Sequence, residues 1–177
     1  MITPQQLHAI MPALSQVKAE TYLPYLNVAL AEGDITTPLR KAAFLAQLSH
    51  ESGELKYFEE IASGKAYEGR KDLGNVVAGD GVRFKGRGPI QLTGRANYRS
   101  CGKALGIDLE NSPEKASELD VAFRTAVWYW TSRKLNVLAD QGTAKFDSIS
   151  YKVNGGWNGK DERRKYYQRA LSVLEVG

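Results

Sequence analysis

The 177-residue chain contains very little cysteine and histidine. Cys101 is the only cysteine, so a disulfide within the chain is excluded, and we expect an inert core thiol. His8 and His50 are the only histidines, which leaves too few ligands for a zinc site of ordinary composition. A metal site would need mostly carboxylates, and we expect no metal and no other cofactor.

Long hydrophobic runs are also absent. Residues 1–6 show no basic segment leading into an apolar core, so no signal peptide is indicated. No apolar run approaches the roughly 20 residues that span a bilayer. We expect no stable membrane insertion and a product that stays in the cytoplasm until something releases it. Without repeats or linkers, residues 1–177 are expected to form a single domain, and we expect a monomer.

The charge is unevenly distributed along the chain. The net charge is +4, but residues 1–60 carry −3 and residues 61–177 carry +7. Six basic residues and no acidic one lie between Arg83 and Lys103 inclusive. Such a run favours a polyanionic partner, which includes nucleic acid, anionic lipid and bacterial wall polymer. A surface that merely keeps the protein in solution is an equal alternative.

Hydrophobic spacing predicts a mainly helical fold. The expected helices cover residues 3–14, 18–32, 37–53, 94–106, 113–134, 143–153 and 160–175. Glycine-rich residues 61–93 break this pattern, and residues 83–93 are typical of a short hairpin or irregular β element. We predict a helical body with a small lobe at about 54–93 and a groove where the two meet.

Glu51 is the first candidate catalytic residue. On a helix it shares an apolar stripe with Phe44 and Leu48. Partial desolvation and the negative end of the helix dipole both favour a carboxyl group that keeps its proton, as a general acid must. A solvated glutamate in the last turn of a helix is the commoner alternative.

A second carboxylate follows the stop signal Ser52-Gly53. In one unbroken helix, Glu51 and Glu60 would lie on opposite faces, about 13.5 Å apart along the axis. A chain that turns back at Gly53 lets the two face each other, and inverting glycosidases separate their acid and base by about 6.5–9.5 Å. Spacing does not choose between Glu59 and Glu60, and a solvated acidic turn is again the alternative.

Polar side chains near the middle of the chain are candidates for binding. If residues 90–93 are extended, Gln91 and Thr93 share one face and offer an amide and a hydroxyl to a groove. A hydroxyl there can hold a water molecule beside a carboxylate. Asn97 and Tyr98 follow within one helical turn and extend the polar lining.

The C-terminal part supplies two further candidates. Asn154 opens the loop 154–159, whose three glycines permit a close backbone approach, as in a binding loop or a plain connection. Arg163 begins an inward-facing stripe that continues through Tyr167 and Ala170. An arginine on that side of a helix requires a carboxylate partner.

Three segments resemble glycoside hydrolase family 19, the plant-type chitinases, in its compact bacteriophage endolysin branch. They are residues 44–53, residues 84–93 with the string Gly-Arg-Gly-Pro-Ile-Gln-Leu, and residues 153–156. The resemblance implies a lysozyme-like, two-lobed helical fold in a single catalytic domain, with no separate wall-binding domain. It implies action on peptidoglycan glycan strands rather than nucleic acid, with the wall reached after a holin-type protein permeabilises the inner membrane of the host bacterium.

The resemblance also implies roles for individual residues. Glu51 matches the general acid, Glu60 the general base, and Thr93 the hydroxyl that helps hold the attacking water. Substrate-lining positions are matched by Gln91, Asn97 and Asn154. Arg163 matches the arginine that organises the carboxylates, and we place His50, which precedes Glu51, in the same group.

The implied reaction is hydrolysis of β-1,4 links between N-acetylated amino sugars in a single inverting displacement. The chain lacks the paired cysteines and long loops of the plant enzymes, so a muramidase acting on peptidoglycan is the first expectation. A chitinase acting on chitin oligomers is the alternative. A lytic transglycosylase and an inactive wall-binding module are more distant ones.

Overall fold

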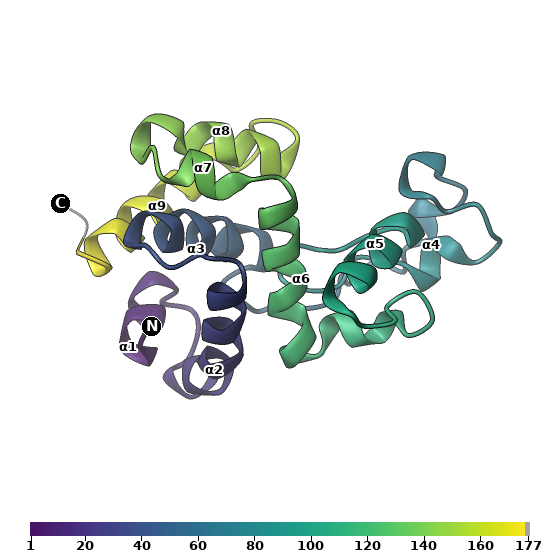
Figure 1. Ribbon diagram of the computed structural model, residues 1–177, viewed down its shortest axis with the longest axis horizontal. Helices are drawn as coiled ribbons and strands as arrows, with labels where there is room; N and C mark the ends of the chain where they lie inside the picture. Colours follow the sequence, from purple (N-terminus) through teal and green to yellow (C-terminus); the bar gives the residue numbers. More distant parts are fainter. Residues whose placement is uncertain (176–177) are drawn as a thin grey trace. The chain divides into compact units, whose positions relative to one another are not determined.

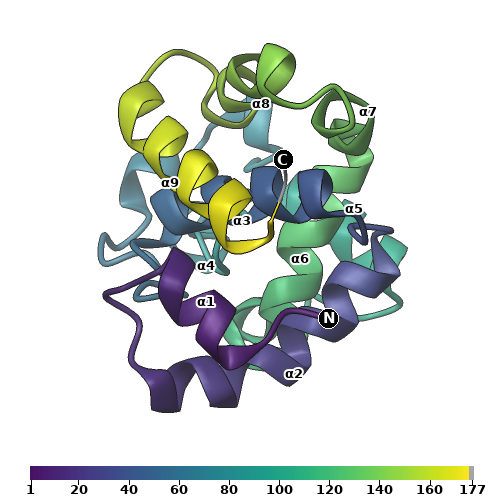
Figure 2. The same ribbon diagram turned by 90° about the vertical axis from the view of Figure 1, so that its left-hand side faces the viewer.

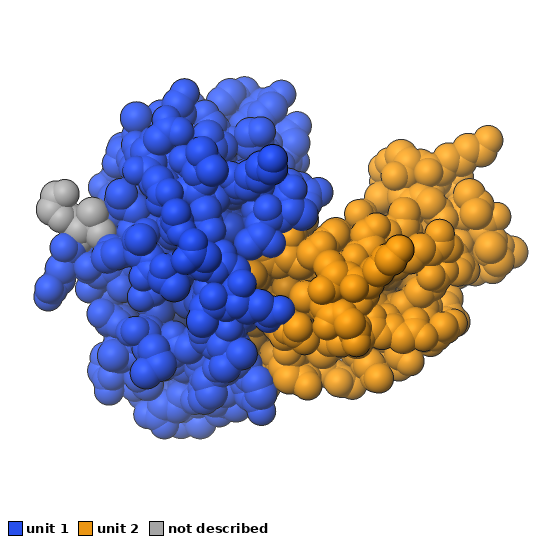
Figure 3. All heavy atoms as spheres, viewed as in Figure 1, with its two compact units in different colours: residues 1–56, 130–177 blue, residues 57–129 orange. Residues whose placement is uncertain are grey.

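The computed structural model describes residues 1–175 and is mostly helical (Figure 1). The chain forms two compact units (Figure 3). Unit 1 combines residues 1–56 with the C-terminal part of the chain from residue 130, and unit 2 contains residues 57–129. Apart from its first three residues, the lobe expected at about 54–93 lies in unit 2.

Unit 1 is a group of helices around a buried central one. Its helices are α1 (Pro4–Ile10), α2 (Gln16–Glu32), α3 (Pro38–Ser52), α7 (Leu135–Ala139), α8 (Thr143–Asn154) and α9 (Lys160–Val173). Helix α3 lies beside α9 (Figure 2) and also contacts α7 and α8. Every residue from Ala42 to Ser49 is buried, so both α3 faces pack against neighbours.

Capping residues set the bounds of α3 as the sequence predicts. The Thr37 side chain accepts a hydrogen bond from the Arg40 amide, and Pro38 occupies the first helical position. Gly53 ends the helix in the left-handed conformation, with φ +59°. These signals fix the last turn of α3, and with it Glu51.

Unit 2 contains short elements joined by turns. They are the 3-10 helices η1 (Lys65–Tyr67), η2 (Lys71–Leu73) and η3 (Pro113–Ser117), with helices α4 (Asp80–Arg83), α5 (Arg95–Leu105) and α6 (Leu119–Ser132), whose last three residues belong to unit 1. Phe84, Tyr98, Cys101 and Leu109 are fully buried in its core. Burial raises the pKa of the Cys101 thiol to about 12, consistent with the inert core residue expected.

The β element expected at residues 83–93 is irregular rather than a hairpin. Within residues 1–175, extended pairing consists of two isolated antiparallel bridges, Glu59–Arg87 and Arg87–Leu92. Gln91 adopts φ +59°, and its amide donates a hydrogen bond to the Gly88 carbonyl at 3.0 Å. Residues 88–91 thus form a turn between the paired residues Arg87 and Leu92, so residues 90 and 91 are not extended, and the condition on which Gln91 and Thr93 would share a strand face is not met.

The acid-free run from Arg83 to Lys103 is largely neutralised inside unit 2. Arg95 binds the buried Asp80 at 2.6 Å and Glu110 at 3.0 Å, while Arg99 binds Glu110 at 2.7 Å. Asp80 and Glu110 lie outside residues 83–103, so the count of charged residues within that run did not include them. The run therefore gives little support to a polyanionic partner.

Glu110 should make the stability of unit 2 dependent on pH. Its hydrogen bonds to Arg99, and then to Arg95, lower its pKa to about 2. The stabilisation is therefore present above the unfolded pKa of about 4.3 and is lost as the pH falls toward 2. Because the pair is partly solvated, we expect Glu110→Gln to cost about 1 kcal/mol at pH 6 and much less at pH 2.5.

Thermal unfolding at the two pH values measures this difference. Glu114→Gln, which changes an exposed glutamate of η3, is the matched control and should retain the wild-type pH dependence. An equal loss of stability for Glu110→Gln at both pH values would contradict the assignment.

Helices long and apolar enough to cross a membrane are not found among residues 1–175.

Candidate active site

In unit 1, Glu51 is held by an arginine from a distant part of the chain. Arg163 on α9 donates from Nη2 to Glu51 Oε1 at 2.6 Å. The Arg163 side chain is 1% exposed and that of Glu51 is 23% exposed. The other oxygen, Oε2, accepts no hydrogen bond from residues 1–175. One oxygen of Glu51 is thus fixed, and the other is left for a reacting partner.

Arg163 is fixed by two more acceptors. Its Nη1 donates to Gln47 Oε1 at 2.6 Å, and its Nε donates to the Asn158 carbonyl at 3.2 Å. Gln47 in turn donates to Ser150 Oγ at 2.9 Å. The sequence prediction that Arg163 faces inward toward a carboxylate is confirmed.

His50 and Asn154 lie around the loop that follows α8. His50 Nδ1 lies 2.8 Å from Glu162 Oε1, and the imidazole packs directly against Gly159, where a Cβ would overlap the ring. Gly159 has φ +71°, so glycine is required there for both space and conformation. Asn154 is the last residue of α8 and is partly buried. His50 therefore anchors this loop.

In unit 2, neutral donors hold both oxygens of Glu60. The Gly86 amide donates to Oε1 at 3.0 Å, and the Tyr67 hydroxyl donates to Oε2 at 2.9 Å. The Glu60 amide donates back to the Gly86 carbonyl at 2.9 Å. Burial, and then the bond to Glu60, raises the pKa of Tyr67, so the phenol stays a donor. These contacts fix the carboxylate without placing a cation on it.

Glu59 has a different environment. Its Oε1 lies 2.8 Å from Lys85 Nζ and 3.8 Å from Arg87 Nε, and its side chain is 48% exposed. The hydrogen bond from Lys85 lowers the pKa of Glu59 despite some burial. The ammonium of Lys85 thus weakens Glu59 as a base. It also reaches the backbone carbonyl of Glu60, at 3.4 Å, but the Glu60 carboxylate keeps neutral partners. The structure separates two residues that spacing left equivalent.

Gln91 and Thr93 border the same glycine as Glu60. A Cβ on Gly86 would lie 2.5 Å from Gln91 Oε1 and 3.3 Å from Thr93 Oγ1. Thr93 Oγ1 donates to the Gln91 carbonyl at 3.0 Å, and Asn97 Nδ2 donates to the Thr93 carbonyl at 2.9 Å. The turn, rather than a strand, therefore brings these polar groups together around Gly86.

Tyr98 does not line a groove. It is fully buried, and its hydroxyl donates to the Lys85 carbonyl at 2.5 Å and accepts from Arg87 Nη1 at 3.0 Å. The expectation that Tyr98 binds substrate is therefore corrected: it is a core residue that supports the segment leading to Gly86. Its position next to Asn97 on the helix predicted that Tyr98 lies near the polar residues, but it did not show that the ring points into the core.

Two residues of the site were missed from the sequence. Gln47 lies four positions before Glu51 on α3, so the two side chains share a helix face. A polar residue on that buried face was a signal that could have identified it. Tyr67 lies in η1, inside the glycine-rich segment, where no periodicity indicates which side chains meet. Its contact with Glu60 depends on turns that pattern alone does not specify.

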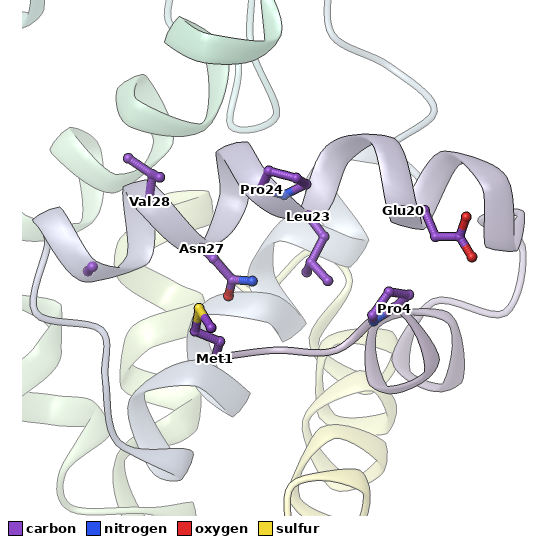
Figure 4. Close-up of a pocket in the computed structure, with 8 residues that line it drawn as sticks. Met1, Pro4, Glu20, Leu23, Pro24, Asn27 and Val28 are labelled. Atoms are coloured by element: carbon purple, nitrogen blue, oxygen red, sulfur yellow. The ribbon is translucent and has the colours of Figure 1, made fainter.

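Two other features lie outside this site. A pocket of about 620 Å³ opens against α2 in unit 1 and is lined by apolar side chains that include Met1, Leu23 and Val28 (Figure 4). It contains none of the predicted site residues. Within the described part of the chain, no group of three or more histidine, cysteine or acidic residues is placed to hold a metal ion. Metal-free chemistry remains a prediction.

The family model described as Chitinase class I, glycoside hydrolase family 19, matches residues 17–145. A Haemophilus influenzae protein described as containing a glycosyl hydrolase family 19 domain is 34% identical over 182 residues, covering 85% of this chain and 87% of the relative. The chain belongs to glycoside hydrolase family 19. The family 19 protein is thus a glycoside hydrolase, as the three sequence segments indicated.

Solved structures show the same fold as this family 19 enzyme. Chitinase C from Streptomyces griseus HUT6037 matches with a TM-score of 0.79 and 25% identity, over 98% of this chain and 92% of that one. A bacterial family 19 chitinase matches with a TM-score of 0.80 and 26% identity, over 99% and 96%. The predicted mainly helical, lysozyme-like fold is confirmed.

Plant relatives are longer. An endochitinase of Arabidopsis thaliana is 43% identical over 142 residues, which are 76% of this chain but 48% of the plant protein. The family 19 enzyme therefore spans about half the length of such relatives. Their names alone do not assign a substrate to it.

Proposed function

We propose that this glycoside hydrolase cuts β-1,4 links between N-acetylated amino sugars with Glu51 as general acid and Glu60 as general base. The contrast between the two carboxylates carries the proposal. Glu51 has one oxygen fixed by Arg163 and one without a partner, whereas both oxygens of Glu60 accept hydrogen bonds from neutral donors. Groups in such different environments are suited to opposite roles in proton transfer.

Each residue then has one task. Glu51 donates a proton from Oε2 to the leaving glycosidic oxygen, while Oε1 keeps its hydrogen bond from Arg163. Thr93 donates its own proton to the Gln91 carbonyl, so its oxygen accepts a hydrogen from the attacking water. Glu60 takes the other proton of that water as the new bond to the anomeric carbon forms and the glycosidic bond breaks. The configuration is inverted, with no covalent sugar intermediate.

The natural substrate we propose is peptidoglycan, cleaved by a bacteriolytic endolysin of muramidase type. Support comes from the sequence resemblance to compact phage endolysins. We propose that the enzyme is made in the cytoplasm of the host bacterium and reaches the wall after a holin-type protein opens the inner membrane. A chitinase is the second candidate, favoured by the names of the plant and Streptomyces relatives.

Product analysis tests these proposals together. The enzyme is incubated with purified peptidoglycan and, separately, with N-acetylglucosamine oligomers. Mass spectrometry should find reducing muramic acid ends, and early NMR spectra should show the inverted anomer. Cleavage of the oligomers alone would favour the chitinase, and 1,6-anhydro ends would indicate a transglycosylase. Binding to peptidoglycan without turnover of either substrate would indicate a wall-binding module.

A further inference from the structure

Two aromatic side chains of unit 1 lie together on the surface. Trp157, in the loop between α8 and α9, is 57% exposed, and Tyr151 on α8 is 46% exposed. Their ring centroids are 4.8 Å apart and the planes are inclined by 56°. An exposed indole retains a large apolar area in contact with water, which a ligand with an apolar face would cover.

The loop that carries Trp157 is anchored to the surroundings of Glu51 at two points. The Asn158 carbonyl accepts from Arg163 Nε at 3.2 Å, and the same guanidinium donates to Glu51. One residue further on, Gly159 packs against the ring of His50, which precedes Glu51 on α3. The indole is thus attached to a backbone held in place relative to the proposed general acid.

Lys160 packs against the Trp157 indole and helps to hold it. Its Nζ lies 4.8 Å from the centre of the Trp157 ring system and 3.7 Å from Asp147 Oδ2. A cation placed in this way fixes the indole orientation and occupies one side of the ring. The exposed part of such an aromatic side chain is suited to the C–H face of a pyranose ring, whose hydroxyl and acetamido groups point outward from its edge.

We propose that Trp157 and Tyr151 form a binding subsite for an N-acetylated amino sugar of the glycan strand, adjacent to Glu51. This inference rests on the proposed function, because it assigns the aromatic pair to the strand that Glu51 helps to cleave. The shared sugar chemistry makes the subsite equally suited to peptidoglycan strands and to chitin oligomers.

Intrinsic fluorescence gives a direct readout. Trp130 is fully buried and Trp128 is partly buried, so Trp157 contributes the most exposed indole emission. The measurement uses the Glu51→Gln variant, which should cleave the ligand only slowly. Adding N-acetylglucosamine hexamer or peptide-free glycan strands should shift the tryptophan emission to shorter wavelength and reduce its quenching by acrylamide. Trp157→Ala should remove this response. It should also weaken binding about three- to tenfold, as measured by calorimetry.

Two further variants keep the result interpretable. Trp157→Phe should recover most of the affinity, and Tyr25→Ala, at a 42% exposed tyrosine of α2, should bind as the parent does. Wild-type cleavage with unchanged affinity in Trp157→Ala would overturn the subsite and leave the proposed function intact. A wild-type enzyme that neither binds nor cleaves the two glycans would overturn both.

Discussion

Glu51→Gln is expected to lower kcat for glycan hydrolysis by about 100- to 10,000-fold, the range of a lost general acid. Glutamine retains an oxygen that accepts the hydrogen bond from Arg163 Nη2, but its amide does not supply the proton that the leaving oxygen needs. Affinity for the glycan should change little, because proton donation to the leaving oxygen stabilises the transition state and not the bound substrate. Initial rates and binding constants on one defined glycan separate the two effects.

Stability must be measured beside the rates for Glu51→Gln. Arg163 is 1% exposed, and removal of the carboxylate charge leaves a buried guanidinium with only neutral acceptors. Thermal unfolding therefore shows whether lower activity reflects an unfolded protein. Glu54→Gln is the matched control: Glu54 accepts from the Tyr166 hydroxyl at 2.6 Å in the same unit and has no proposed role. A folded Glu51→Gln with wild-type turnover would contradict the assignment of the acid.

The local parts of the fold were predictable because short-range signals determine them. Thr37, Pro38 and Gly53 bound α3 at the residues predicted, since capping needs only neighbours in the chain. The inward direction of Arg163 also followed from helical spacing. The family resemblance then placed Arg163 among the carboxylates, and the structure gives Glu51 as its partner at 2.6 Å.

The rest depended on contacts between distant segments. Gln91 was placed on a strand because alternation suggested one, but the turn that begins at Gly88 requires φ +59° at Gln91. The partners of Glu60 come from η1 and from Gly86, segments in which glycine removes any periodic pattern. The basic run was misleading for the same reason, because Asp80 and Glu110 are brought to it by folding.

Glu60→Gln is expected to reduce turnover by about 100- to 10,000-fold, whereas Glu59→Gln should reduce it by less than about fivefold. Glutamine at position 60 still accepts the Gly86 amide hydrogen bond, and the Tyr67 hydroxyl can rotate to accept from the new amide group. The site should thus stay folded but lack a base. At position 59, the change removes only a partly exposed ion pair with Lys85, whose contribution is small.

A small anion distinguishes a missing base from a damaged site. In Glu60→Ala, azide can enter the vacated space and attack the anomeric carbon without needing a base. We expect azide to restore cleavage and to give a glycosyl azide of inverted configuration, detectable by NMR. Glu59→Ala should show no such product. If Glu59→Gln were inactive while Glu60→Gln turned over normally, the base would be Glu59, and the Lys85 ammonium would have to leave it before each reaction.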